Sequence, residues 1–279
     1  MRRMLAFASC LIVLLAVPAV AQPRGEAVPL LVTSEWLAAH LDDPQVVVLW
    51  TDQGSHDEAL IPGARAVPHE SLMTMQGGHQ LAATDDLVRT LRKAGVSNES
   101  HVVIYGDALS AGWLFFVLDH LGHTRMSLLD GGLVKWRSED RPIARTPVAP
   151  PAGTFTARPR APLLVSAGDV QARAKGGTVL LDARSSKEYD AGRIPGAKLL
   201  TWTDVFADPR RQVFKSRQEL IELFRAAGAG PGSSAITYCQ IGLRSSALYF
   251  AARYAGLDVA NYVGSWSDWT ARGLPVEGR

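Results

Sequence analysis

Residues 235–246 read AITYCQIGLRSS, and this stretch joins three kinds of sequence. Residues 235–238 are mostly apolar and predict a buried strand, while the pattern over residues 243–254 predicts an amphipathic helix. Cys239 begins the short loop between them, which contains Gly242 and ends in Arg244. A strand, a tight loop and a helix in succession are typical of α/β sheets, where functional sites form at the carboxyl ends of the strands.

The chain repeats itself at a constant spacing of 133 residues, because IPGA occurs at residues 61–64 and again at residues 194–197. Four further pairs have the same spacing: Tyr105 and Tyr238, Gly131 and Gly264, Trp136 and Trp269, and Pro142 and Pro275. Several matches at one spacing predict two copies of one fold.

Each half alternates short apolar runs with helical patterns. Further strands are expected at residues 46–50, 102–105 and 178–182, and further amphipathic helices at residues 84–94, 111–121 and 216–227. Strands that alternate with helices favour a parallel sheet. We therefore predict an α/β protein with two tandem domains, each a mainly parallel sheet flanked by helices.

A signal peptide and a linker complete the predicted organisation. Arg2 and Arg3 precede an apolar run at residues 5–17, and Ala-Val-Ala at residues 19–21 has the small-x-small form of a cleavage site. An uncleaved anchor is the alternative, although the run is short for a membrane span.

Residues 145–162 contain five prolines and predict an extended linker. The expected parts are a signal peptide at 1–21, a domain at 22–144, the linker at 145–162 and a second domain at 163–279, with export to the periplasm or out of the cell.

Composition argues against several classes of function. The formal net charge of +2 is too small to favour nucleic acid or an anionic membrane as a partner. Signal cleavage would remove Cys10 and leave Cys239 alone, so neither an internal disulfide nor a redox dithiol is expected. All seven histidines lie between His40 and His123, which disfavours a Cys–His hydrolase or a metal site at Cys239. A buried, unreactive cysteine is the structural alternative.

The loop that begins at Cys239 is suited to hold an anion. Gly242 allows a tight turn, so that loop amides can point toward the sulfur. The start of the following helix and the charge of Arg244 also favour a thiolate over a thiol. Such a thiolate can attack without a general base, in either phosphoryl or sulfur transfer. The Cys-x4-Arg spacing is shorter than the Cys-x5-Arg spacing of cysteine phosphatases, and the smaller ring favours a persulfide.

The motifs of the chain, in order and partly in duplicate, resemble those of the tandem-domain rhodaneses, which are sulfurtransferases. The resemblance covers residues 30–277. Its motifs are CQIGLR at 239–244, LDAR at 181–184, Glu188-Tyr189, GRIPGA at 192–197 and YVGSWSDW at 262–269. Two positions depart from the family pattern, because Arg193 stands where histidine is usual and Val263 where aspartate is common.

The resemblance implies a role for each residue of the site. Cys239 would carry a persulfide, and Arg184 and Arg244 would bind an anionic substrate. Asp182 would orient Arg184 or the loop, and a plain ion pair that fixes a strand end is the structural alternative. Amides of the loop would hold the outer sulfur, and the residues concerned are Gln240, Ile241, Gly242 and Leu243. No metal ion and no organic cofactor is implied.

The first half lacks these groups. The residues opposite Cys239, Arg244, Asp182 and Arg184 at the repeat spacing are Gly106, Ala111, Leu49 and Thr51. The resemblance implies an inactive first domain that covers the active loop and shapes the substrate entrance. His56, Arg65 and His69 could reach that entrance, although exposure to solvent is expected for each.

The sequence therefore predicts an exported, monomeric sulfurtransferase with one active site, in contact with neither nucleic acid nor, once the signal is cleaved, a membrane. Its donor would be a small anion. Thiosulfate is favoured over mercaptopyruvate because an exported enzyme meets it more readily. The acceptor would be cyanide or a thiol. The alternatives are a phosphatase or arsenate reductase of the same fold, and a non-catalytic sulfur carrier.

Overall fold

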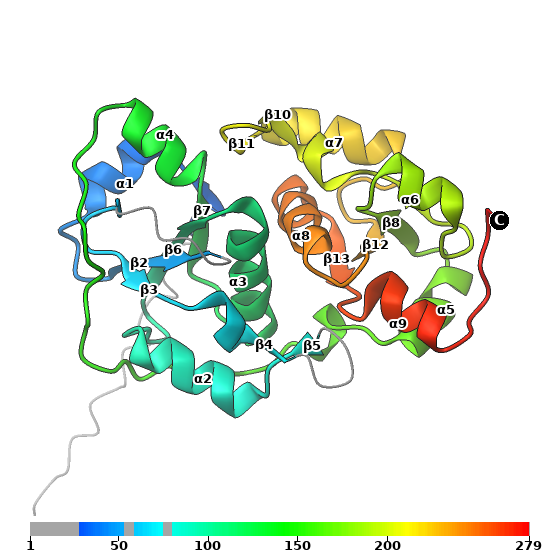
Figure 1. Ribbon diagram of the computed structural model, residues 1–279, viewed down its shortest axis with the longest axis horizontal. Coiled ribbons are helices and arrows are strands. Elements are labelled where there is room, and N and C mark those ends of the chain that lie inside the picture. Colours follow the sequence, from blue (N-terminus) through cyan, green and yellow to red (C-terminus); the bar gives the residue numbers. More distant parts are fainter. Residues whose placement is uncertain (1–27, 53–58, 75–79, 279) are drawn as a thin grey trace, which may run out of the picture.

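The computed structural model describes residues 28–52, 59–74 and 80–278, and it places the two halves of the chain in separate α/β lobes (Figure 1). The predicted signal peptide at residues 1–21 lies outside the described residues, and so does His56. Within the described part of the chain, no helix is long and apolar enough to cross a membrane.

The first domain is built on a parallel sheet in the order β1-β7-β6-β2-β3. Its central strands are apolar on both faces, as helices on both sides of a parallel sheet require. The strands are β1 (Leu31–Val32), β2 (Val46–Thr51), β3 (Arg65–Ala66), β6 (His101–Gly106) and β7 (Met126–Leu129), and a separate hairpin is formed by β4 (Met73–Thr74) and β5 (Gln80–Leu81). The helices are α1 (Ser34–His40), α2 (Thr84–Lys93), α3 (Ala108–His120) and α4 (Gly132–Ser138), with a 3₁₀ turn η1 at His69–Leu72.

The second domain repeats this plan with a parallel sheet in the order β13-β12-β8-β9. A parallel bridge between Leu164 and Asn261 stands where β1 pairs with β7 in the first domain. The strands are β8 (Val179–Asp182), β9 (Lys198–Leu199), β12 (Ser234–Tyr238) and β13 (Asp258–Asn261), with a hairpin of β10 (Phe206–Asp208) and β11 (Val213–Phe214). The helices are α5 (Ala167–Lys175), α6 (Ser186–Ala191), α7 (Arg217–Ala226), α8 (Arg244–Ala255) and α9 (Ser265–Ala271), with 3₁₀ turns η2 (Ala161–Leu163) and η3 (Trp202–Val205).

The predicted strands and helices are all present, and so is the duplication. Its repeated aromatic residues make the same contacts twice. The Tyr105 hydroxyl accepts a hydrogen bond from the Ile61 amide at 3.1 Å, and Tyr238 accepts one from Ile194 at 3.3 Å. Likewise the indole N–H of Trp136 donates to the Pro142 carbonyl, and that of Trp269 to the Pro275 carbonyl. These residues recur because they fix the same turns in both sheets.

The helices α3 and α8 lie between the two sheets and face each other (Figure 1). The prediction that both are amphipathic is wrong, because their side chains are buried on nearly every face. One face of each helix covers its own sheet and the other packs on the neighbouring domain. Phe115 and Phe250 meet edge to face across this contact, with ring centroids 4.9 Å apart. The largest hydrophobic core therefore contains residues of both domains.

The linker and the two hairpins tie the domains together further. Residues 145–160 form no helix or strand and run along the first domain, where Phe155 donates its amide to Val96 and Arg158 to Leu121. The β10–β11 hairpin of the second domain reaches the first, because the Phe214 amide donates to the Asp130 carboxylate at 2.9 Å. The β4–β5 hairpin reaches the second domain in the opposite direction (Figure 1).

Candidate active site

Cys239 follows directly after β12 and is 1% exposed. The segment after β13 holds Cys239 through hydrogen bonds to both its amide and its carbonyl. Its amide donates to the Ser265 hydroxyl at 3.0 Å, and its carbonyl accepts from the Trp266 amide at 3.0 Å. The next carbonyl, of Gln240, accepts from the Ser267 amide, and the Gln240 side chain donates to the Ser267 hydroxyl. The start of the loop is thus fixed by a neighbouring loop that the same sheet presents at the same edge.

Gly242 forms the inner turn of the loop and has a φ of +90°. Its amide donates to the Cys239 sulfur at 3.1 Å. The sequence predicted that amides of the loop would point toward the sulfur, and this is one such amide. A Cβ at this position would lie 2.4 Å from the Val263 carbonyl oxygen, so only glycine fits without a shift of backbone. The neighbouring side chains differ in exposure, because Leu243 is buried whereas Ile241 is 39% exposed at the loop surface.

Arg244 is the first residue of α8, and its guanidinium binds a carboxylate of α6. Its Nη1 and Nη2 donate to the two oxygens of Glu188 at 2.8 and 2.7 Å, in a bidentate ion pair. These hydrogen bonds, and to a smaller extent the nearby Cys239 sulfur, raise the pKa of Arg244. In return, hydrogen bonding to Arg244 lowers the pKa of Glu188 to about 2, so the pair is fully charged at neutral pH.

The sequence assigned no role to Glu188, although it is the residue that holds Arg244. It is the third residue of α6 and belongs to a capping box with Ser185. Glu188 accepts from the Ser185 amide at 3.0 Å and from its hydroxyl at 2.7 Å. The S-x-x-E spacing was a visible signal for a helix start, but nothing local indicated that the same carboxylate would meet a residue 56 positions later.

Arg184 is buried in an ion pair. It is 2% exposed and pairs with the fully buried Asp182, with Nη2 to Oδ2 at 2.7 Å. The guanidinium also donates to the Gly192 carbonyl and lies 4.5 Å from the ring centre of Trp266. Burial opposes its charge, but the hydrogen bond and the charge of Asp182 prevail and raise the pKa of Arg184. The geometry is that of the plain ion pair which the sequence left open, and substrate binding by Arg184 stays a prediction.

Asp182 is at the centre of this buried polar group. Besides Arg184 it accepts a hydrogen bond from the Tyr238 hydroxyl at 2.7 Å. Tyr238 immediately precedes Cys239, so the network fixes the end of β12 from which the loop departs. Full pairing is needed here, because an isolated buried carboxylate is strongly destabilising.

The loop of the first domain has no nucleophile and no room for one. Gly106 occupies the position of Cys239, and a Cβ there would lie only 1.7 Å from the Thr51 carbonyl oxygen. Two residues that could have reached the predicted substrate entrance, His69 and Arg65, were expected to be exposed to solvent, and the structure places them differently. His69 is buried rather than exposed, and Arg65 donates to the Ala94 and Gly95 carbonyls beside the linker.

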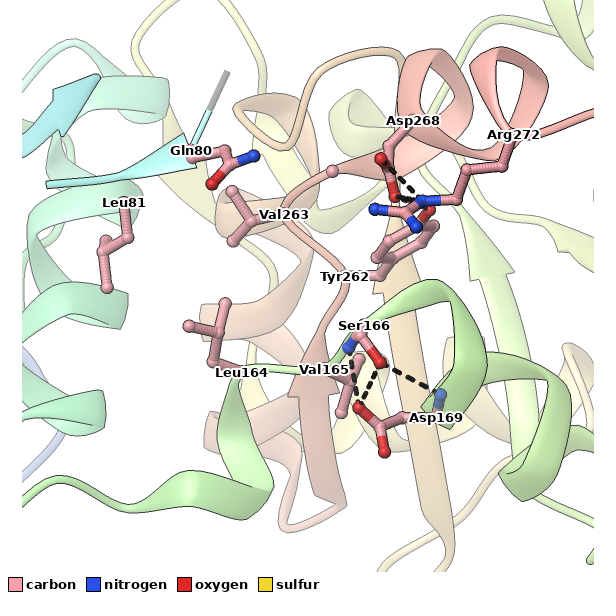
Figure 2. A pocket seen from close by; sticks show the side chains of 11 residues that line it. Gln80, Leu81, Leu164, Val165, Ser166, Asp169, Tyr262, Val263, Asp268 and Arg272 are labelled. Carbon is pink, nitrogen blue, oxygen red and sulfur yellow. Dashed lines mark hydrogen bonds and ion pairs between the residues drawn. The ribbon is translucent and has the colours of Figure 1, made fainter. Parts of the chain in front are cut away.

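The first domain does approach the surroundings of the loop. Ser246, in the first turn of α8, donates to the Leu109 carbonyl of α3 at 3.3 Å. Figure 2 shows a pocket of about 360 Å³ between Gln80 and Leu81 of the β4–β5 hairpin and the segment around Val263, which packs against Gly242. None of residues 239–244 lines this pocket. Arg272 forms an ion pair with Asp268 in its wall, and Asp169 accepts hydrogen bonds from the amide and hydroxyl of Ser166.

The arrangement provides a buried sulfur with one amide donor, near an arginine whose charge is offset by a carboxylate. Among the described residues, no cluster of three or more His, Cys, Asp or Glu side chains is placed to hold a metal ion. Cys239 is the single thiol of the described residues. Nucleophilic chemistry at sulfur is what these groups can support.

Comparisons with known proteins agree with this fold. Residues 33–139 and 166–272 each match the rhodanese-like domain family. A relative named sulfur carrier protein TtuD, from Thermus thermophilus, is 29% identical over 88% of this chain and 95% of its own length. A relative named putative thiosulfate sulfurtransferase, from Haloferax volcanii, is 30% identical over 88% of this chain and 96% of its own length.

A solved structure is similar as well. It is that of SseA from Escherichia coli, described as a 3-mercaptopyruvate sulfotransferase, with a TM-score of 0.75 and 26% identity over 86% of this chain and all of that one. The two matched segments, the two lobes and the cysteine loop between strand and helix lead to one conclusion. The chain belongs to the rhodanese family as two rhodanese-like domains in tandem, and it is a sulfurtransferase.

Proposed function

We propose that this protein transfers sulfur through a persulfide on Cys239. The Cys239 thiolate attacks the outer sulfur of the donor and forms a new S–S bond. With thiosulfate, the S–S bond of the donor breaks and sulfite leaves with the bonding electron pair. An acceptor nucleophile then attacks the outer sulfur of the persulfide, and the Cys239 thiolate is released. Cyanide would yield thiocyanate in this step, and a thiolate would yield a new persulfide.

The observation that carries the proposal is the hydrogen bond from the Gly242 amide to the Cys239 sulfur. It places an N–H donor on a buried sulfur at the start of a helix, where the helix terminus also favours negative charge. Thiosulfate and mercaptopyruvate are the proposed donors, in line with the names of the relatives. With mercaptopyruvate a C–S bond breaks, and the carbon takes up a proton from solvent to give pyruvate.

We further propose that the protein is exported and monomeric. The motif at residues 1–21 supports export, with arginines, an apolar run and a small-x-small site in order. Mass determination of the protein recovered from outside the cytoplasm tests the cleavage, which is expected after Ala21.

A sulfur carrier is the second candidate function, because the Thermus thermophilus relative bears that name. A carrier would load Cys239 once and deliver the sulfur to a partner protein, with little turnover on small acceptors. Phosphatase or arsenate reductase activity is a weaker alternative, because the Cys-x4-Arg spacing leaves a smaller ring than those reactions use.

The first prediction concerns Cys239. Excess thiosulfate should add one sulfur atom to the intact mass of the protein and release sulfite. Cys239→Ser should abolish the adduct and reduce turnover to the uncatalysed rate. Thiosulfate, mercaptopyruvate and a phosphate ester should be offered side by side, with cyanide as acceptor. Turnover by the serine variant would contradict the mechanism, as would hydrolysis of the phosphate ester in preference to sulfur transfer.

A further inference from the structure

Arg184 and Arg244 are both ion-paired with carboxylates of the second domain, so each positive charge is offset by a neighbouring negative charge. Arg184 is paired with Asp182 inside the protein, and Arg244 is paired with Glu188 at its surface. The sequence had offered both cations as partners for an anionic substrate. In the structure, the Gly242 amide and the start of α8 direct positive potential at the sulfur, and Arg244 also acts on it with a charge that Glu188 offsets.

Glu188 is held firmly in this position. Its carboxylate accepts two hydrogen bonds from Ser185 and two from Arg244, so that both oxygens are engaged. The side chains of Arg244 and Glu188 are 24% and 32% exposed, and water screens the pair only in part. A bidentate arginine–carboxylate pair of this kind fixes both geometry and charge.

Neutralisation of Arg244 affects the possible donors unequally. Thiosulfate carries two negative charges next to the sulfur that is transferred. Mercaptopyruvate carries one carboxylate at the far end of the molecule from its sulfur. A full positive charge beside Cys239 would therefore attract thiosulfate more strongly than mercaptopyruvate. The exposed neighbour of Cys239 in the loop, Ile241, is apolar and supplies no replacement charge.

We propose that Glu188 is a specificity-determining residue of the sulfur-transfer site. By neutralising Arg244 it lowers the preference for donors with charge next to the transferred sulfur. This inference rests on the proposed persulfide chemistry at Cys239. It assigns to Glu188 a role in the choice of donor, in addition to its role as a helix cap.

Glu188→Gln tests this role, because glutamine has nearly the shape of glutamate and keeps one acceptor oxygen for Ser185 and Arg244, but removes the charge. The variant should raise kcat/KM for thiosulfate by about fivefold or more, and change kcat/KM for mercaptopyruvate by less than about twofold. Glu188→Asp keeps the charge and should keep the donor preference of the unmodified protein. Loading of Cys239, followed by intact mass, gives the same comparison without an acceptor.

Glu219→Gln is the matched control. Glu219 is also the third residue of a helix and forms a capping box, with Ser216 at the start of α7. Its replacement removes one negative charge and one capping carboxylate away from the loop. Both donors should be used by this variant as by the unmodified protein. Thermal melts of all three variants report any loss of folding.

Salt dependence provides a test that needs no variant. If Glu188 neutralises Arg244, added NaCl should reduce kcat/KM for thiosulfate only weakly in the unmodified protein, and more steeply in Glu188→Gln. A steep salt dependence in the unmodified protein would overturn the proposal. So would an equal fall for both donors in Glu188→Gln, which would make Glu188 a positioning residue for Arg244. Failure of either donor to load Cys239 in the unmodified protein would instead overturn the proposed function itself.

Discussion

Gly242 shows how a single residue shapes the loop that begins at Cys239. Its left-handed backbone, with a φ of +90°, lets the chain turn so that its amide meets the Cys239 sulfur. The same position is pressed against the backbone of Val263, with no space for a side chain. The sulfur contact and the close packing are therefore two consequences of one missing Cβ.

Gly242→Ala should damage the site more than the fold. The clash with the Val263 carbonyl and the strained φ should cost about 2–4 kcal/mol of stability. Movement of the amide should slow loading of Cys239 by thiosulfate by roughly tenfold or more, since a donor on the sulfur is lost. Urea melts and intact-mass loading rates measure the two effects.

Gly232→Ala is the control, because Gly232 has a φ of +80° with nothing within 4 Å of an added Cβ. It should cost about 1 kcal/mol from backbone strain alone and leave loading unchanged. If Gly242→Ala loads at the normal rate, the amide at this position is not needed by the sulfur.

At the scale of elements, the contact between α3 and α8 joins the two domains and supports the site. α8 begins at Arg244, so its position determines where the loop ends. Gly112 of α3 lies against the backbone of α8, and a Cβ there would be 2.9 Å from the Ala247 amide nitrogen. The close approach also brings Asp119 of α3 to the Tyr249 hydroxyl at 2.8 Å.

Gly112→Ala should separate the two helices. The added methyl group overlaps backbone rather than a flexible side chain, so a loss of about 1–3 kcal/mol is expected despite the higher helix propensity of alanine. Movement of α8 should also lower the rate of sulfur transfer. Gly168→Ala in α5 is the control, because its Cβ would meet only the Ser166 hydroxyl, at 3.7 Å. Equal stability of the two variants would show that the helix contact is not tight.

For the whole molecule, the uneven distribution of histidines makes the first domain sensitive to acid. His69, His101, His120 and His123 are all buried in that domain, and burial lowers the pKa of each. The lowering is largest at His101, to about 4. Its Nε2 lies 2.7 Å from the Ser127 hydroxyl, which donates its own proton to the Pro29 carbonyl. Nε2 must therefore be the protonated nitrogen of a neutral ring.

Stability should fall as the pH is lowered from 7 to 5. The unfolded chain takes up protons on these histidines near pH 6.5, whereas folded His101 stays neutral until about pH 4, so protonation favours unfolding over this range. His101 alone should contribute a loss of about 2 kcal/mol between pH 7 and 5. Urea unfolding at the two pH values measures it. His101→Gln should reduce the difference, and a free energy of unfolding equal at pH 7 and pH 5 would contradict the assignment.

The amino-acid sequence by itself determined the duplicated α/β fold and the position of Cys239 in a loop between a strand and a helix. Both follow from local patterns, namely apolar runs that end in a turn and residues that recur at one spacing. Tyr105 and Tyr238 recur because each fixes the same turn within its own domain. A contact between residues of the same repeat therefore recurs in the second repeat, and the sequence shows its residues at the constant spacing of 133 positions.

Only the tertiary structure decided which carboxylate pairs with each arginine near the Cys239 loop. Arg184 and Arg244 look alike in sequence, yet one is enclosed with Asp182 and the other is held by Glu188 at the surface. Likewise α3 is buried on nearly all its faces because a second domain covers it. Burial and ion pairing depend on neighbours that are distant in the chain. A local sequence pattern shows one of the two contacting segments and does not identify the other.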